Sequence, residues 1–365
     1  MLNFCFRTNL SLLIFALFTS ITGYSQHSFQ GAETQVNTTT ADKQHSPCVA
    51  RNANGAFVVV WSSIGADGDG AGVYAQMYNP DGTTNGSEFL VNQTTEDNQT
   101  APSVDIDING NFAVVWMSYG QDFDGWGIYG RIYNSSGVAQ TNEFLINNTV
   151  VGDQKFPKIG MSNGGDFAVV WSNATTGDIY LQRFQDSGST LGNETKVNTD
   201  SINHQAYPDM EMDNNGDFVV TWQSLNQDGS NHGIYFQRYD GVGSPRDAET
   251  LVNTVTSNNQ QEPSIGVGTT AAFVIAWASY GQDGSEDGIY AQRYDNTGVA
   301  QDSEFKVNTT TTGMQAHPDV AMSSDGAFVI TWSSYGQDGS FHGVYLQAYN
   351  SEGLAVESEM QINTN

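Results

Sequence analysis

The sequence is poor in basic residues and in cysteine. Its 365 residues include 12 Lys and Arg against 40 Asp and Glu, a formal net charge of −28 at pH 7, and only two cysteines. Nucleic acids and anionic membrane surfaces are bound through clustered basic side chains, so this balance argues against both classes of partner. Cations, neutral sugars and basic protein surfaces remain compatible with the charge.

Long apolar runs are also missing, except for one near the amino terminus at residues 10–18. A short apolar run that follows an Arg and precedes small residues is typical of a secretory leader, which predicts a signal peptide at 1–25 cleaved after Ser25. The run is shorter than the ~20 residues of a spanning helix, so we expect no membrane insertion. Cys5 would leave with the leader and Cys48 would remain alone, so no disulfide is expected in the mature chain.

What the sequence does contain is a sixfold repeat. One Trp per copy returns every 55 residues, or after 51 in one case, at Trp61, Trp116, Trp171, Trp222, Trp277 and Trp332. A Pro upstream of each Trp and a Gln three residues before that Pro keep the same register, so the repeats begin near residues 44, 99, 154, 205, 260 and 315. A period of this length indicates a repeat architecture.

Each copy reads as four short strands. A half-polar segment after the Pro leads through an Asn-Gly or Asp-Gly pair, which predicts a two-residue hairpin turn, to the apolar run that ends in Trp. A Gly-Ile-Tyr-x-Gln-Arg-Tyr segment and a Glu-Phe-x-Val-Asn segment follow. Because the Trp segment is apolar on both sides, we expect both of its faces to be covered. These features predict an all-β fold, a six-bladed propeller of four-stranded antiparallel blades that occupies 26–365.

The chain carries one more outer strand than six blades need. The surplus copy lies at 33–37, before the first full repeat. Either this segment or Glu359–Asn363 would complete the outer edge of the last blade and close the ring, and the other would lie free or add a fifth strand. An open solenoid is the alternative architecture, and it would require polar end caps that the sequence does not show.

The run GQDGSEDGIYAQRYD at 281–295, followed by SEFKVNTT, resembles a known repeat. It is similar to units of about 55 residues that occur in tandem in large secreted bacterial surface proteins, often beside cadherin-like or haemolysin-type calcium-binding segments. The resemblance covers nearly the whole chain after the leader. It implies an exported, surface-associated and adhesive protein, and it implies little chemistry.

The loops between the second and third strands carry a repeated Asp. An Asp-Gly turn explains the pattern, since the carboxylate accepts local N–H groups and Gly supplies a positive φ. Calcium binding by carboxylate oxygens is the alternative, although no copy has the full Asp-x-Asp-x-Asp-Gly spacing. The residues concerned are Asp67, Asp69, Asp122, Asp124, Asp228, Asp283 and Asp338. Calcium is thus the only cofactor that the sequence brings into question.

Residues that break the repeat are better candidates for function, because the scaffold does not require them. Antiparallel order places the loops after the Trp strands and those before the Pro strands on one face, where variable loops on a rigid scaffold can bind ligands. The candidates on this face are Phe123, Trp126, His232, Asp287, Phe341 and His342. Flat aromatic rings next to amides and carboxylates suit sugars, which stack their apolar faces and bond through hydroxyls.

We therefore expect a secreted or cell-surface binding propeller, active as a monomer, that recognises carbohydrate or another extracellular polymer. No catalytic constellation is evident. An extracellular polysaccharide-acting enzyme, a glycoside hydrolase or lyase with paired carboxylates near the axis, is the first alternative. A structural module without a ligand is the second.

Overall fold

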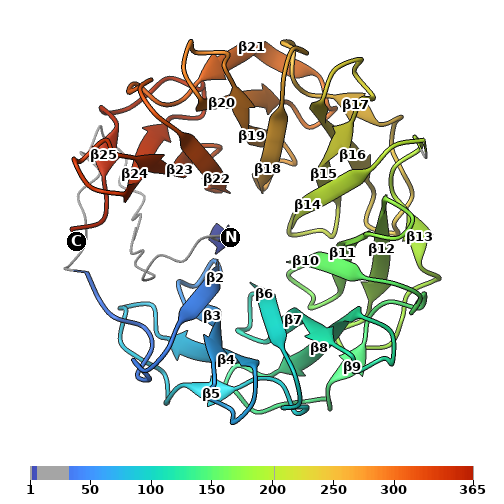
Figure 1. Cartoon of the computed structure of the whole chain (residues 1–365). Helices are drawn as coiled ribbons and strands as arrows, with labels where there is room; N and C mark the ends of the chain where they lie inside the picture. Colours follow the sequence, from blue (N-terminus) through green and yellow to red (C-terminus); the bar gives the residue numbers. More distant parts are fainter. Residues whose placement is uncertain (1, 6–32, 201, 365) are drawn as a thin grey trace.

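Six antiparallel sheets close into a ring around a central axis (Figure 1). The computed structural model describes residues 2–5, 33–200 and 202–364. Within these ranges no helix is long and apolar enough to cross a membrane. The ring confirms the predicted six-bladed propeller with four antiparallel strands in each blade. The first blade has a fifth, short strand on its inner edge, β1 (Leu2–Cys5).

The strands occupy four concentric layers. The innermost are β2 (Gln44–Arg51), β6 (Gln99–Ile106), β10 (Gln154–Met161), β14 (Gln205–Met212), β18 (Gln260–Val267) and β22 (Gln315–Met322). The second are β3 (Phe57–Ile64), β7 (Phe112–Tyr119), β11 (Phe167–Asn173), β15 (Phe218–Leu225), β19 (Phe273–Tyr280) and β23 (Phe328–Tyr335). The third are β4 (Ala71–Tyr78), β8 (Trp126–Tyr133), β12 (Asp178–Phe184), β16 (His232–Tyr239), β20 (Asp287–Tyr294) and β24 (His342–Tyr349). The outermost are β5 (Phe89–Leu90), β9 (Phe144–Leu145), β13 (Thr195–Lys196), β17 (Thr250–Leu251), β21 (Ala300–Lys306) and β25 (Met360–Gln361).

The second strand of each blade is the most buried, as its apolar run predicts. In β19 every residue is buried except the last, and Trp277 has no exposed surface. Its Phe273 stacks on Tyr294 of β20, with ring centroids 4.7 Å apart and planes 11° from parallel. Such a pair adds about 0.5–1.5 kcal/mol beyond the burial of the rings. The other blades stack the equivalent two rings in the same way.

The apolar core lies between blades rather than within them. One continuous cluster joins Val274 and Ile289 of the fifth blade to Phe328 and Trp332 of the sixth. The clusters between the first and second, second and third, third and fourth, and fourth and fifth blades have the same composition. Because each sheet covers the apolar side of its neighbour, no blade can bury its core alone and the ring must close.

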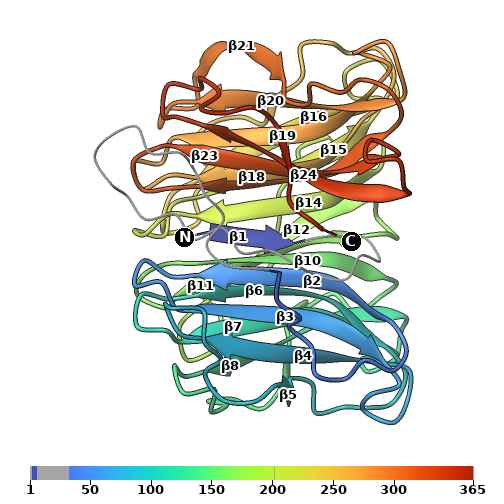
Figure 2. The same cartoon turned by 90° about the vertical axis from the view of Figure 1, so that its left-hand side faces the viewer.

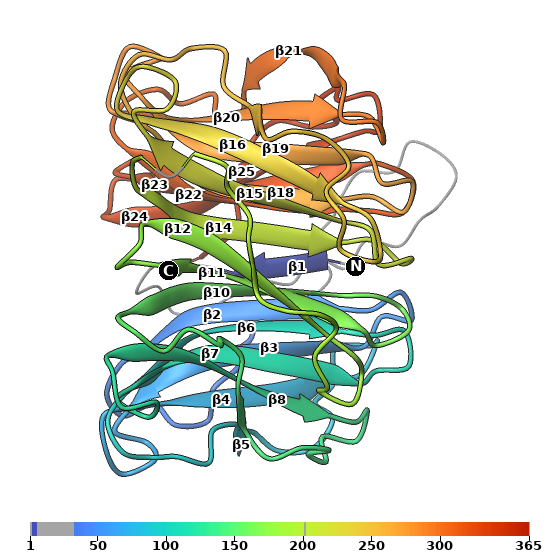
Figure 3. The same ribbon diagram turned by 90° about the vertical axis from the view of Figure 1, so that its right-hand side faces the viewer.

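The inner strands run along the axis, so their connections emerge on two opposite faces (Figures 2 and 3). β1 lies inside the ring against β2, with Cys5 opposite Cys48. Cys48 is disulfide-bonded, and Cys5 is the only other cysteine. The prediction of no disulfide concerns the chain after Cys5 has left with the leader, so this pairing in the full-length chain does not test it. Apart from residues 2–5, the predicted leader at 1–25 and its cleavage after Ser25 lie outside the described residues.

One asparagine per joint ties neighbouring blades together. At the joint between the fifth and sixth blades, Asn308 accepts the N–H of Ile289 on its Oδ1 at 2.7 Å. Its Nδ2 donates to Oε1 of Gln315, the first residue of β22, at 3.1 Å. Asn308 and Gln315 are fully buried, so their bonds replace water and fix the register between blades.

Where the ring closes, two residues divide this work. Asn363 accepts the N–H of Val344 at 2.8 Å, and Asn37 donates to Gln44 at 3.3 Å. β25, and not the segment at 33–37, supplies the outer strand of the last blade. Residues 33–37 form no strand, which is one of the outcomes left open above, and they supply the first half of the closing joint.

The turns between first and second strands differ from the predicted two-residue hairpins. In the first blade the N–H of Gly55 donates to the carbonyl of Asn52 at 3.0 Å, which closes a four-residue turn. Only the Gly of the Asn-Gly pair takes a positive φ, of +91°. This is a type I turn followed by a left-handed Gly, which the same dipeptide also suits.

Candidate functional site

We call the face that carries the second-to-third-strand loops and the blade-to-blade connections the loop face, and the opposite face the turn face. Large apolar side chains are exposed on the loop face at the ends of second strands and in the loops that follow. Phe123 and Phe341 are 98% and 76% exposed. The others are Ile64, Tyr119, Tyr280 and Tyr335, each 39–49% exposed.

The repeated Gln-Asp-Gly loops on this face belong to the scaffold. In the fifth blade Gln282 donates to Oε1 of Glu304 at 2.7 Å, and Oε2 of the same Glu304 accepts the N–H of Thr254 at 2.6 Å. Oδ1 of Asp283 accepts the N–H of Ser285 at 3.1 Å. The motif therefore joins a loop, an outer strand and the connection from the preceding blade. Equivalent Gln–Glu and N–H–Glu bonds recur around the ring.

The repeated carboxylates stabilise the turns in these loops. Each accepts an N–H two residues on, in the five loops of Asp67, Asp122, Asp228, Asp283 and Asp338. Asp69 and Asp124 accept N–H groups from the connection into the next blade. The Gly that opens the third strand is required, since a Cβ on Gly288 would lie 2.7 Å from the Asp283 Oδ2.

Calcium binding at these carboxylates stays a prediction. Within the described ranges, no group of three or more His, Cys, Asp or Glu side chains is arranged to hold a metal ion. Burial raises the pKa of the Asp122 carboxyl, and neighbouring backbone N–H groups oppose that rise. The pairs Asp67/Asp69 and Asp122/Asp124 already have N–H partners. A bound ion would have to share or replace those partners.

A ring of six strained residues surrounds the axis near the loop face. The residue before the repeated Pro adopts a left-handed backbone in every blade, with φ between +51° and +58°. At the same place each inner strand shifts register against the second strand. We call these residues the pre-proline ring: Ser46, Ala101, Phe156, Tyr207, Glu262 and His317. A positive φ costs a non-Gly residue on the order of 1–3 kcal/mol, and such strain gathers at functional sites.

The pre-proline ring has an aromatic part and a charged part. The rings of Phe156 and Tyr207 stack with centroids 4.5 Å apart and planes 29° from parallel. Nδ1 of His317 lies 2.8 Å from Oε2 of Glu262, and the backbone N–H of His317 donates to that same oxygen at 3.1 Å. All four side chains are partly exposed. A flat apolar surface thus lies beside a carboxylate–imidazole pair on one end of the axis.

Asp287 adds a recessed carboxyl to the charged part. It is the first residue of β20, opposite Tyr280, and only 8% of it is exposed. Its Oδ1 is buried and has no hydrogen-bond partner. Burial first, and then the negative charge of Glu262, raises the pKa of Asp287 to about 6, while His317 acts in the opposite direction. The three side chains therefore share one electrostatic environment.

The other predicted candidates lie apart. Trp126 packs edge-on against Tyr119 at 5.2 Å and against the core between the second and third blades. Nδ1 of His342 lies 3.0 Å from Oγ of Ser333, and Nδ1 of His232 lies 3.2 Å from Oδ1 of Asn259. Phe123 and Phe341 project into solvent, as their exposures show. The six candidates belong to four blades, so the structure does not gather them into one site.

Sequence reasoning missed Phe156, Tyr207 and Glu262. The available signal was the position immediately before the repeated Pro, which differs in all six copies while the Pro itself never changes. Its importance depends on the bulge and on the packing of neighbouring blades, which bring positions about 55 residues apart into contact.

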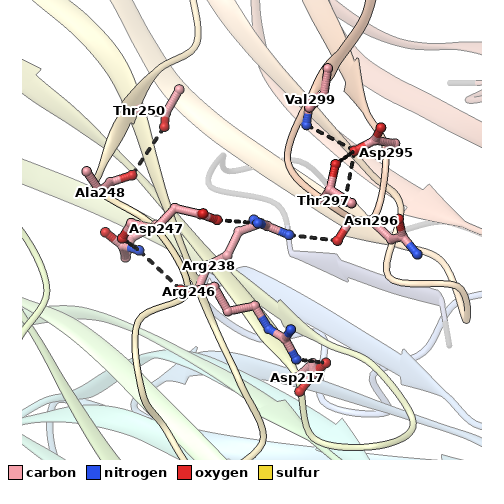
Figure 4. A network of polar contacts seen from close by, with 11 residues as sticks. Asp217, Arg238, Arg246, Asp247, Ala248, Thr250, Asp295, Asn296, Thr297 and Val299 are labelled. Carbon is pink, nitrogen blue, oxygen red and sulfur yellow. Dashed lines mark hydrogen bonds and ion pairs between the residues drawn. The ribbon is translucent and has the colours of Figure 1, made fainter.

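The turn face holds a cavity of about 260 Å³ between the fourth and fifth blades. Arg246 pairs with Asp217 at 2.5 Å, and Arg238 pairs with Asp247 and donates to the carbonyl of Asn296 at 2.7 Å (Figure 4). Arg183 and Arg293, on the third strands of the third and fifth blades, make the same contact with the next turn. With both guanidinium groups matched by carboxylates, the cavity belongs to the scaffold.

No protein-family model and no curated protein sequence matches this chain. Its fold is similar to that of an ulvan lyase, a polysaccharide lyase, with 12% identity and a TM-score of 0.56 over 86% of this chain and 81% of that one. A second polysaccharide lyase has 10% identity and a TM-score of 0.55 over 99% and 90% of the two chains. A protein of unknown function from Dyadobacter fermentans has 12% identity and a TM-score of 0.54 over 82% and 93%. At these identities the similarity shows the propeller fold alone.

Proposed function

We propose that this chain is an exported propeller that binds carbohydrate or another extracellular polymer through its loop face. The observation that carries the proposal is the stacked pair Phe156 and Tyr207, which is partly exposed at a position that varies between repeats. Aromatic faces bind the apolar faces of sugar rings, and the nearby amides and carboxylates offer bonds to hydroxyls. Similar propellers among polysaccharide lyases support a carbohydrate ligand.

Several weak contacts around the loop face would act together on a long polymer. Tyr119 with Trp126, and Tyr335 with His342, form further aromatic pairs at second-strand ends. A polymer that spans two such places gains avidity without any tight single site. The predicted leader and the resemblance to repeats of secreted surface proteins support the exported, adhesive part of the proposal.

The test is binding of purified protein to immobilised neutral and charged polysaccharides, with Tyr207→Ala and Trp126→Ala as variants. Removal of a stacking ring is expected to weaken binding about tenfold or more. Leu354→Ala is the matched control, since Leu354 is a 61% exposed apolar residue on the turn face. Binding that is unchanged in both aromatic variants, or lost equally in the control, would overturn the proposal.

Cleavage of the polymer is the second candidate function. Glu262, His317 and Asp287 are unrepeated acid and base groups in one region of the loop face, and acid–base catalysis requires such groups close together. Incubation with the bound polysaccharide, followed by measurement of new chain ends, separates the two functions. Product formation that disappears in His317→Ala would favour the enzyme, and binding without any product would favour the adhesive protein. A structural module without a ligand is left if nothing binds.

A further inference from the structure

The Asp287 carboxyl, next to the charged part of the pre-proline ring, lacks a donor. Oδ1 of Asp287 has no hydrogen-bond partner although nine-tenths of the residue is buried. A buried carboxyl oxygen without a donor is uncommon, because burial removes the water that would otherwise bond to it. Something outside the present set of contacts is therefore needed to satisfy it.

The charges that face Asp287 make that donor a cation. From its own loop and strand these are Glu286 and Asp283, from β18 Glu262, and from β22 His317. Residues 260–364 contain only two Lys or Arg side chains, and one of them, Arg293, bonds the carbonyls of Ser351 and Glu352 on the turn face. His317 is already engaged with Glu262. The negative charge near Asp287 thus exceeds the positive charge available within these two blades.

The aromatic part lies next to this acidic group. Tyr207 and Glu262 occupy neighbouring positions of the pre-proline ring, on β14 and β18, which pack against each other. A ligand that stacks one ring on Phe156 and Tyr207 therefore places its next unit toward Glu262 and Asp287. The net charge of −28 repels anionic polymers and attracts cationic ones over the whole surface.

We propose that this part of the loop face binds an amino sugar, with a sugar ring stacked on Phe156 and Tyr207 and a protonated amine of the neighbouring unit bonded to Asp287 and Glu262. An ammonium group supplies three donors and a positive charge, and the Asp287 carboxylate needs a donor in surroundings that are mainly negative. The inference rests on the proposed function, because it names the class of carbohydrate that the same face selects.

The experiment compares two soluble oligosaccharides of equal length, a β-1,4-linked glucosamine tetramer and its fully N-acetylated form, by titration calorimetry at low and at moderate salt. The wild-type protein is expected to prefer the free amine about tenfold at low salt, and less at higher salt. Asp287→Asn and Glu262→Gln should each reduce this preference to about threefold or less. Phe156→Ala should weaken both ligands to a similar degree.

Two controls keep the result interpretable. Glu352→Gln removes one negative charge from an exposed position on the turn face and should keep the full preference. Thermal melting checks that each variant is folded, and Asp287→Asn is expected to melt no lower than the wild type. Equal affinity for the two tetramers, or a preference that survives Asp287→Asn, overturns the inference and leaves carbohydrate binding standing. Binding of neither tetramer and of no neutral or charged polysaccharide overturns the inference and the proposed function together.

Discussion

The joint between the fifth and sixth blades and the joint that closes the ring, between the sixth and first blades, come from the same repeat and are held together differently. The first has one continuous apolar cluster that includes Trp332, which is fully buried. The second has two smaller clusters, one around Leu346 and one around Trp61, which is 4% exposed. Val36 and Val49 pack against these smaller clusters from the side.

The internal joint has the larger continuous core, and it is also the joint that carries candidate functional residues. No chain connection runs from the sixth blade to the first, so the closing joint takes its contacts from the two ends of the chain. The internal joint makes these contacts within one continuous cluster. It also carries Glu262 and His317, whose backbones are strained, and the buried Asp287. We infer that the closing joint opens first on unfolding, because it has the smaller continuous core.

Loss of a core Trp should show this difference most strongly. Trp332→Ala is expected to lower the free energy of unfolding by about 4 kcal/mol, near the upper part of the range for a buried Trp. Trp61→Ala should cost about 3 kcal/mol, because the cluster around it is smaller and can collapse more easily. Urea unfolding followed by tryptophan fluorescence and circular dichroism measures both. A larger loss at Trp61 would contradict the ranking of the two joints.

Substitution of the joint asparagines tests the division of work at the closing joint. Asn308→Ala leaves the buried N–H of Ile289 and the Gln315 carbonyl oxygen without partners, and should cost about 2–3 kcal/mol. Asn37→Ala removes the bond to Gln44 and an exposed bond to the carbonyl of Thr39, and should cost about 1 kcal/mol. If the two variants lose equal stability in the same urea titration, the closing joint depends on Asn37 as much as an internal joint depends on its single residue.

The buried Asp287 should make the contribution of the internal joint to the free energy of unfolding depend on pH, unlike joints without a buried acid. The pKa of Asp287 is raised to about 6, whereas an unfolded Asp titrates near 4, so the folded state holds this proton more tightly. Its contribution to stability is full below about pH 4, falls as pH rises, and is lost above about pH 6.

Asp287→Asn has no such proton to lose. Two pKa units correspond to about 3 kcal/mol, and partial access of water reduces this to about 1–2 kcal/mol. The variant should therefore gain that amount over the wild type between pH 4.5 and pH 7.5. Melting temperatures at both pH values measure the gain, with Glu352→Gln as the control for loss of an exposed carboxyl. A difference that is the same at both pH values would show that Asp287 ionises like an exposed Asp.

The fold could be predicted because each of the six repeats carries the same pattern of strand and turn residues. The Trp, the Pro and the Val/Ile-Asn pair recur in fixed register, and a strand that is apolar on both sides demands cover on both sides. What could not be predicted were features that depend on one local choice among several. Asn-Gly suits both a two-residue hairpin and the type I turn that forms at Asn52–Gly55.

The site was harder to predict because it forms only when consecutive blades pack against each other. Asp287 stood out as a break in the repeat, and the structure places it beside His317 and Glu262. Phe156 and Tyr207 stood on inner strands, where the position before Pro varies in every copy and resembled tolerated noise. Their rings come into contact through the left-handed bulge, and Phe and Tyr have no preference for a left-handed backbone that would have predicted it.

The smallest effects are expected where glutamates hold the connections between blades. Glu359 bonds the N–H of Thr309 at 2.6 Å and the amide of Gln337 at 2.5 Å, whereas Glu33 bonds the hydroxyl of Thr364 at an exposed position. Glu359→Gln should cost about 1 kcal/mol, because its new amide faces two donors, and Glu33→Gln no more than about 0.5 kcal/mol. Differential scanning calorimetry resolves these as shifts of about 2 °C and under 1 °C. A shift for Glu33→Gln as large as that for Glu359→Gln would mean that the segment at 33–37 clamps the closing joint from outside, so that the ring is secured by its ends and not by its core.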